Sequence, residues 1–268
     1  MLKDITLGQF FPGTSMIHRL DPRTKIILLI VYITALFLAK SWISYAVMFL
    51  FLAEVIHISK IPVKSIVRGM KPLVMILIFT GVLNLFFTRE GTVLVQFLGL
   101  AVTAGGVQRA VLMMSRILML ITGTFLLTYT TSPIALTDAL ESLLGPLKKI
   151  GVPVHDLSMM MCIALRFIPT LIEETDKIMS AQKARGADFE SGNLMDRAKA
   201  LIPILVPLFV SAFRRADELA TAMECRCYQG GEGRTKMKLL HYHREDFVSF
   251  AIGGLLIALI LCLAFFGF

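Results

Sequence analysis

The chain has 268 residues, of which 56% are hydrophobic and only 17% are charged, and its mean hydropathy is +0.75. This composition excludes an ordinary soluble domain and indicates an integral membrane protein. The formal net charge is +8, with 12 Lys/Arg and 6 Asp/Glu in residues 1–144, 15 and 13 in residues 145–246, and none in residues 247–268. A dense, nearly balanced block between charge-poor segments predicts a water-facing domain between membrane spans and disfavours nucleic-acid binding.

Two spans are predicted near the start of the chain. The uncharged runs Ile26–Ala39 and Ser41–Ala53 are each shorter than the ~20 apolar residues that a membrane-crossing helix needs. The helices should therefore extend over Lys40 at their junction and over Glu54 and His57 at the far end. Ionisable residues in a span are candidates for function, but a position near the membrane boundary makes an interfacial role the simpler interpretation of this pair.

Basic residues indicate which side of the membrane the loops occupy. One basic cluster precedes the first run and a second cluster separates the second run from the third, and cytoplasmic loops are enriched in Lys and Arg. Both clusters should therefore be cytoplasmic, which places Lys40 and the turn at Arg89–Glu90 outside. The clusters are Lys3, Arg19, Arg23 and Lys25, and Lys60, Lys64, Arg68 and Lys71.

The middle of the chain is predicted to cross the membrane once after the third span, Pro72–Thr88. If Gly91–Gln108 and Ile117–Thr137 both crossed, the charged block would lie outside, against the positive-inside tendency. Gly91–Gln108 is rich in glycine and threonine, so we expect it at the membrane interface, followed by a long helix that runs toward Tyr129. Its sequence does not decide whether this segment crosses the membrane. The final run, Phe247–Phe268, then exits outward.

The predicted fold is therefore an all-α integral membrane protein with about five transmembrane helices. Residues 1–144 form a membrane domain of about four spans, residues 145–246 form a cytoplasmic domain of long amphipathic helices, and residues 247–268 form the last transmembrane helix. We expect a multi-pass protein of the cell membrane, with the N-terminus and the charged block in the cytoplasm and the C-terminus outside.

The charged block opens with a long amphipathic helix predicted over Ser158–Ala184, where apolar residues recur at helical spacing. Gly186 supplies the conformation that usually ends a helix. Three methionines, Met159, Met160 and Met161, lie at the start of this helix. Their flexible side chains suit either an adaptable partner surface or ordinary packing.

Two further helical stretches are predicted in the charged block. The first starts near Leu194 and includes Leu201–Phe213, an uncharged run that is too short to span and is interrupted by Pro203 and Pro207. It is expected along the membrane surface or under other helices. The second is Arg214–Glu224, whose small and charged residues end just before Arg226 and the glycines at 230 and 231.

Two arginines stand in similar surroundings at the ends of these predicted helices. The segments Lys183–Ala187 and Glu224–Tyr228 place Arg185 and Arg226 between small residues, 41 positions apart. A guanidinium with five donors can bind carboxylates or backbone carbonyls in the groove of a partner. The alternative is that each cation complements the dipole of its own helix. The repetition leaves these two interpretations about equally weighted.

These paired motifs, together with His18–Lys25 before the first span and Gly231–Lys236 after the second motif, resemble the transmembrane T component of energy-coupling factor (ECF) transporters, the EcfT/CbiQ family. The resemblance covers essentially the whole chain. It implies that the cytoplasmic helices are coupling helices that dock into two ABC-type ATPase subunits, while the membrane part holds a substrate-binding S component. The implied function is uptake of a vitamin or metal ion, through one dedicated S component or several interchangeable ones.

The resemblance also implies roles for individual residues. The first motif matches the family's Ala-Arg-Gly pattern in full, whereas the second carries cysteines where alanine or glycine is usual. Cysteine is still small, so docking is expected there, and the effect of the two thiols is open. The expected ATPase-docking residues are Ala184, Arg185, Gly186, Cys225, Arg226 and Cys227, and the coupling surface toward the S component is expected at Met159, Met160, Met161, Pro203 and Pro207.

No cofactor or metal is expected on this chain. The Gly-rich stretch from Gly230 to Lys236 lacks the residue order of a phosphate-binding loop and follows a helix where a strand is required. Cys225 and Cys227 with His241 and His243 have single-residue spacings that are unlike common zinc sites. ATP and Mg are therefore expected on the partner ATPases, and the chain is not expected to be an enzyme.

The main alternative function is a self-contained secondary transporter. Such a protein needs a midplane binding site built from broken helices or buried charges, often in repeated halves, and the sequence shows no such halves. An intramembrane enzyme is a third interpretation, and it lacks paired catalytic residues within the spans. The transported molecule is not named by this sequence, because the resembling family places specificity in the S component.

Overall fold

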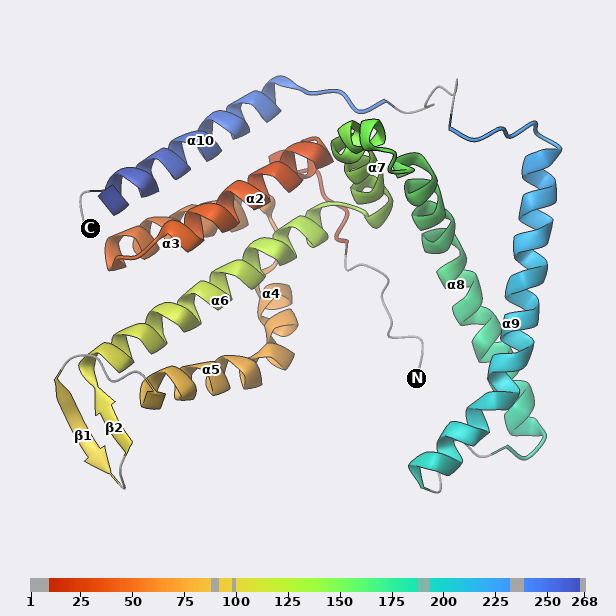
Figure 1. Ribbon diagram of the computed structural model, residues 1–268, viewed down its shortest axis with the longest axis horizontal. Helices are drawn as coiled ribbons and strands as arrows, with labels where there is room; N and C mark the ends of the chain where they lie inside the picture. The colour runs from red at the N-terminus through yellow and green to blue at the C-terminus, as the bar shows by residue number, and fades with distance from the viewer. Residues whose placement is uncertain are drawn as a thin grey trace. The chain divides into compact units, whose positions relative to one another are not determined.

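The computed structural model describes residues 10–87, 92–97, 100–187, 189, 193–231 and 239–265 (Figure 1). In this part of the chain the structure is helical apart from one two-stranded hairpin, so the predicted all-α class is confirmed. The chain divides into two compact units, described separately below. The membrane unit joins Gly8–Ala139 to Leu240–Phe268, and the charged unit includes Leu140–Leu239. Outside the described residues lie several that the sequence interpretation used: Lys3, Arg89–Glu90, Gly91 and residues 232–236.

Helices make up most of the membrane unit. In chain order its elements are α1 (Met16–Arg19), α2 (Pro22–Leu38), α3 (Trp42–Ser59), α4 (Val63–Met70), a short 3-10 turn (Lys71–Leu73), α5 (Val74–Phe87), β1 (Val93–Phe97), β2 (Leu100–Thr103), α6 (Ala104–Thr130), the start of α7 (Pro133–Leu144) and α10 (Arg244–Phe265).

Local signals set the boundaries of α2 and α3. Asp21 caps α2 by accepting the Arg23 backbone N–H at 2.9 Å, and Pro22 takes the first helical position, where its missing N–H costs nothing. Ser41 caps α3 by accepting the Ser44 N–H at 3.2 Å. The predicted extension over Lys40 was wrong, because α2 ends at Leu38 and Lys40 lies exposed between the two helices. The predicted extension of α3 past Glu54 and His57 is confirmed, since α3 continues to Ser59.

The core of the membrane unit lies between α2, α3, α6 and α10 (Figure 1). Leu36, Met48 and Ile260 are completely buried in it. The helices α10 and α2 approach closely at Gly253, where an added Cβ would lie 2.6 Å from Leu28 Cδ2. A larger residue at this glycine would therefore push the last helix away from the first span.

The starts of α2 and α10 are joined by a buried carboxylate. Asp246 is completely buried and accepts the Asp21 backbone N–H at 2.9 Å and the His243 backbone N–H at 2.7 Å. Arg23 adds to the same junction, because its guanidinium donates to the Leu240 carbonyl at 2.6 Å and lies 4.6 Å from the centre of the Tyr242 ring. The two ends of the membrane unit are thus tied by directional bonds as well as by apolar packing.

The segment predicted at the membrane interface contains a hairpin that the sequence analysis missed. In it, β1 and β2 pair antiparallel, with Val93 opposite Thr103 and Phe97 opposite Leu100. Strands of five and four residues are too short to cross a bilayer, so this segment does not span. The Thr103 hydroxyl then caps α6 by accepting the Gly106 N–H at 3.1 Å, and α6 runs to Thr130, which confirms the predicted long helix.

Among the residues that the structure describes, five helical segments are long and apolar enough to cross a membrane: α3, α4 with α5, α6, α8 and α10. This number agrees with the sequence prediction, but the set differs. It includes α8, whose apolar first half precedes a charged second half, and it omits α2, which has 17 residues. Length and composition alone thus leave α8 able to cross, and its cytoplasmic placement stays a prediction.

The charged unit contains the end of α7, a 3-10 turn (Gly145–Ile150) and two long helices, α8 (Val154–Ala184) and α9 (Leu194–Glu224). The sequence analysis placed two helical stretches where the structure has α9 alone, and that interpretation was wrong. Pro203 and Pro207 lie inside α9 without ending it, and Figure 1 shows the ribbon of α9 turning in its first half. Prolines bend a helix where neighbouring residues tolerate the lost hydrogen bond.

Candidate functional site

The first arginine motif closes α8 with a complete set of capping bonds. The Gly186 N–H donates to the Lys183 carbonyl at 3.0 Å, and the Ala187 N–H donates to the Gln182 carbonyl at 3.0 Å. This is the Schellman pattern, in which the residue after the cap adopts a left-handed conformation. Gly186 has φ of +88°, and Arg185 is the cap residue immediately before it.

The second motif closes α9 in the same way. The Cys227 N–H donates to the Glu224 carbonyl at 2.8 Å, and the Tyr228 N–H donates to the Met223 carbonyl at 3.1 Å. Cys227 has φ of +56° and takes the left-handed position that glycine takes in the first motif. Arg226 is therefore structurally equivalent to Arg185, one residue before the left-handed turn.

Both guanidinium groups are available to a partner. Arg185 and Arg226 are exposed, as are Ala184, Gly186, Cys225 and Cys227 around them. In the part of the chain that the structure describes, neither arginine forms an ion pair or a side-chain hydrogen bond with another residue. Each arginine sits beside the carbonyl end of its own helix, which favours the positive charge, and its donors still point to solvent.

Contacts between α8 and α9 show that the two helices run antiparallel. Gln182 near the end of α8 donates to the Pro203 carbonyl near the start of α9, whereas Glu174 lies opposite Ser211 and Arg215. The first motif is therefore close to the Pro203 end of the pair. From Pro203 to Glu224 the helix rises about 32 Å, so the two motifs lie at opposite ends of the α8–α9 pair.

Glu174 is the polar centre of this helix pair, in the charged second half of α8. Its carboxylate accepts a short hydrogen bond from the Ser211 hydroxyl and a bond from the Arg215 guanidinium at 3.0 Å. The Ser211 bond, with the charge of Arg215, lowers the pKa of Glu174 more than desolvation raises it. The group is therefore ionised at neutral pH and fixes the register of the two helices.

An apolar face covers the middle of α9. Its large side chains follow one another at helical spacing and are exposed, a pattern that marks a partner surface or membrane contact. On α8, Met160 and Met161 are exposed and Met159 is half-buried, and Pro203 and Pro207 are exposed on α9. The exposed apolar residues of α9 are Leu201, Ile202, Leu205, Val206, Phe209, Val210 and Phe213.

A further cluster beside the second motif was not predicted. Glu141 at the end of α7 bonds to His155 Nδ1 and to the Ser158 hydroxyl, each at 3.0 Å, and thereby joins α7 to α8. The His155 ring packs against Gly231, where an added Cβ would lie 2.5 Å from the ring carbon Cδ2. The segment that follows Arg226 is thus held against the start of α8. The sequence offered no signal for this contact beyond an isolated acidic residue.

Other candidate residues do not assemble into a chemical site. In the described ranges, no three His, Cys, Asp or Glu side chains are arranged to hold a metal ion. The four cysteines, Cys162, Cys225, Cys227 and Cys262, are free thiols. Glu54 lines a cavity of the membrane unit, while His57 is exposed one turn later on α3.

A family model described as "Cobalt transport protein" (CbiQ) matches residues 13–237, which include both arginine motifs. The chain belongs to the CbiQ/EcfT family of ECF transmembrane components. Membership in this family places the chain among the membrane proteins of a transporter.

Relatives within this family match nearly the whole chain. An energy-coupling factor transporter transmembrane protein EcfT from Ruminiclostridium cellulolyticum is 55% identical, with 92% of each chain covered. The EcfT of Thermosediminibacter oceani is 54% identical over 95% of this chain and 96% of its own length. The EcfT of Bacillus subtilis is 49% identical over 92% and 93%. The predicted family resemblance is therefore confirmed.

Proposed function

We propose that this chain is the coupling subunit of an ECF-type importer. Two ABC-type ATPases, which hold ATP and Mg, bind the helix ends at Arg185 and Arg226, and a substrate-binding S component sits on the exposed apolar face of α9 with Met160 and Met161. The chain itself binds no cofactor and catalyses no reaction. Its α8–α9 pair transmits closure of the ATPases to the S component during uptake of a vitamin or metal ion.

A single observation carries this proposal: two helices end in the same Schellman turn with the same exposed arginine. One such arginine is explained by its own helix dipole. Two equivalent arginines at opposite ends of one antiparallel helix pair fit two equivalent binding sites, which two identical or two related ATPase subunits would supply. The antiparallel pair also presents the two arginines at opposite ends, where each can meet a different subunit.

The proposal includes an orientation. The basic clusters before α2 and around α4 face the cytoplasm with the charged unit, and the C-terminus lies outside. Because both ATPases use cytoplasmic ATP, the docking arginines must lie on that side. The positive-inside tendency supports the same placement.

Co-purification of partner subunits tests the proposal. The chain is expressed in its host, extracted in mild detergent, and analysed by mass spectrometry as wild type, Arg185→Glu, Arg226→Glu and the double variant. We expect each single variant to weaken ATPase binding and the double variant to lose both ATPases while it still inserts in the membrane. The matched control is Arg214→Glu, which reverses another exposed arginine on α9 and should keep both partners.

Retention of both ATPases by the double variant would rule out the docking role. Substrate uptake by liposomes that contain this chain alone would instead support a self-contained transporter. If the S component is lost when Phe209→Asp is introduced, while the ATPases stay bound, the α9 face is assigned to that partner.

A further inference from the structure

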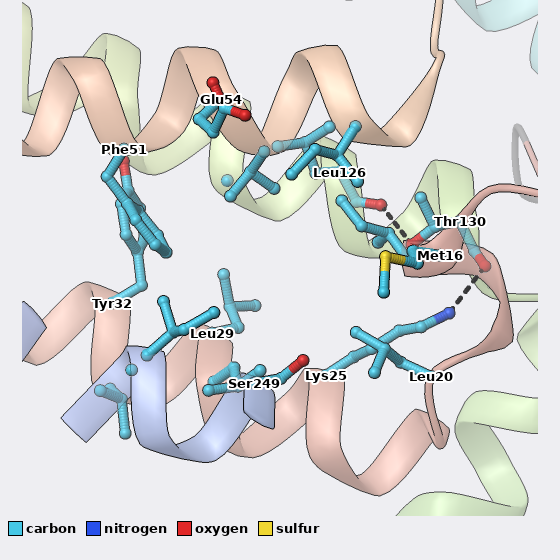
Figure 2. A pocket seen from close by; sticks show the side chains of 18 of the residues that line it. Met16, Leu20, Lys25, Leu29, Tyr32, Phe51, Glu54, Leu126, Thr130 and Ser249 are labelled. Carbon is cyan, nitrogen blue, oxygen red and sulfur yellow. Dashed lines mark hydrogen bonds between the residues drawn. The ribbon is translucent and has the colours of Figure 1, made fainter. Parts of the chain in front are cut away.

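A cavity of about 480 Å³ lies inside the membrane unit, between α2, α3, α6 and α10. Figure 2 shows Tyr32 and Phe51 at one end of this cavity and Lys25 with Thr130 at the other. Most of its lining residues are aliphatic or aromatic, and its volume is in the range of ligand-binding cavities. The apolar part of such a cavity has no polar partners for water, and when it is empty its walls are left without contact partners.

The shape of the cavity fits one lipid chain. Along α10 its lining extends from Arg244 to Leu256, positions that are 12 apart and so separated by about 18 Å of helix. One leaflet of the bilayer core is about 15 Å thick, half of the whole. The Lys25 end is level with helix ends: α2 and α10 begin there, and α3 and α6 end there. The cavity therefore runs from the membrane surface to about the midplane, as an acyl chain does.

Charged side chains in the cavity lining indicate which headgroup the lipid carries; Lys25 lies at the open end, whereas Glu54 lies on α3 nearer to Phe51 (Figure 2). The cavity is lined by two cations, Lys25 and Arg244, and by two carboxylates, Glu54 and Glu245. The Lys25 ammonium group already donates hydrogen bonds to the Thr130 carbonyl at 3.0 Å and to other oxygens. Of the residues that the structure describes, none forms an ion pair with Arg244, Glu54 or Glu245.

We infer that the cavity binds one zwitterionic aminophospholipid, of the phosphatidylethanolamine type. One acyl chain fills the apolar space, the lipid phosphate pairs with Arg244, and the lipid ammonium group pairs with Glu245 or Glu54. Balanced lining charges suit a headgroup that carries both signs, whereas an anionic lipid would meet two carboxylates without a counter-charge. The ethanolamine ammonium group donates charge-assisted hydrogen bonds to those carboxylates, whereas the quaternary nitrogen of choline has no N–H to donate.

Native mass spectrometry of the full chain tests this inference. The purified chain is stripped of lipid and titrated with phosphatidylethanolamine, phosphatidylglycerol or phosphatidylcholine. We expect one phosphatidylethanolamine per wild-type chain and weaker retention of the other two lipids. The variant Ser249→Trp fills the cavity from α10 and should lose this lipid, and Leu255→Trp, exposed on the same helix outside the cavity lining, should retain it.

A second variant pair separates the headgroup from the acyl chain. Removing both carboxylates in Glu54→Gln/Glu245→Gln should reduce the preference for phosphatidylethanolamine over phosphatidylglycerol about tenfold, the effect of losing one charge-assisted bond, with chain binding retained. If Ser249→Trp does not fold, Ser249→Leu makes the same test with less added volume. Equal lipid retention by the cavity-filling variant and its control overturns the inference, and so does equal retention of the three lipids by the wild type.

Discussion

The left-handed cysteine at the end of α9 makes a sharp test of how the second docking motif is built. Cys227 has φ of +56°, a conformation that costs a residue with a side chain about 1 to 2 kcal/mol and costs glycine almost nothing. Glycine also loses more backbone entropy on folding, by roughly 0.5 to 1 kcal/mol. Cys227→Gly should therefore stabilise the helix end by about 0.5 to 1 kcal/mol.

Cys225 supplies the matched control, two residues earlier. Its φ of −59° and ψ of −23° are helical, so glycine there gains nothing from its freedom and loses about 0.5 kcal/mol of helix propensity. Cysteine-to-glycine substitution should thus stabilise the helix end at position 227 and destabilise it at position 225. Neither variant alters Arg226.

Amide hydrogen exchange measures both effects where they occur. The reporters are the Cys227 and Tyr228 amides, which donate to the Glu224 and Met223 carbonyls in the capping turn. Exchange should slow about two- to fivefold in Cys227→Gly and quicken about twofold in Cys225→Gly, since each 1.4 kcal/mol of local opening is a factor of ten. Faster exchange in Cys227→Gly, or the same sign in both variants, would refute the capping argument.

Three other predictions concern the charged unit and the topology. Gly231→Ala should weaken ATPase binding at the second motif several-fold by displacing the segment from His155, with the first motif unaffected, as single-subunit binding assays would show. The pKa of Glu174 is lowered in the folded chain, so the stabilisation that Glu174 gives to α8–α9 pairing is full above its ordinary pKa. This stabilisation is lost as the pH falls through the lowered pKa, and amide hydrogen exchange in the pair should then become faster. Glu174→Gln should remove this acid sensitivity. In a background without native cysteines, Lys40→Cys should react with an impermeant thiol reagent from outside intact cells and Lys64→Cys only after lysis, whereas labelling of both from outside would contradict the orientation.

Many helix boundaries of the membrane unit can be predicted from the positions of charged and helix-ending residues in the sequence. Spans end where Lys, Pro and Ser interrupt apolar runs, and these signals act locally, so α3 was predicted close to its observed bounds. The prediction for α2 was less accurate, because α2 begins at Pro22, before its uncharged run, and ends at Leu38, before Lys40. The hairpin was missed because its short strands are as apolar as a helix, and periodicity does not distinguish the two over so few residues.

Of the two arginine motifs, the turn at the first was predictable from the sequence and the turn at the second was less so. The left-handed turn at Gly186 was predictable, because glycine is the residue that usually adopts it. Cys227 adopts the same conformation, and no glycine in the motif indicates the turn. The prolines of α9 suggested a break that packing against α8 overrides. The cavity and the Glu141–His155 contact depend on residues from separate helices, which no local pattern brings together.

The bond between Asp21 and Asp246 has a consequence for how the protein is made. It joins residues 225 positions apart, so α2 is complete long before its partner helix leaves the ribosome. During that interval the whole charged unit is synthesised, while the Asp21 N–H and the apolar side of α2 have no α10 to pair with. Closing so long a chain segment costs little more entropy than closing a short one, because the cost grows only with the logarithm of its length. The membrane unit is thus finished last, by the final helix of the chain.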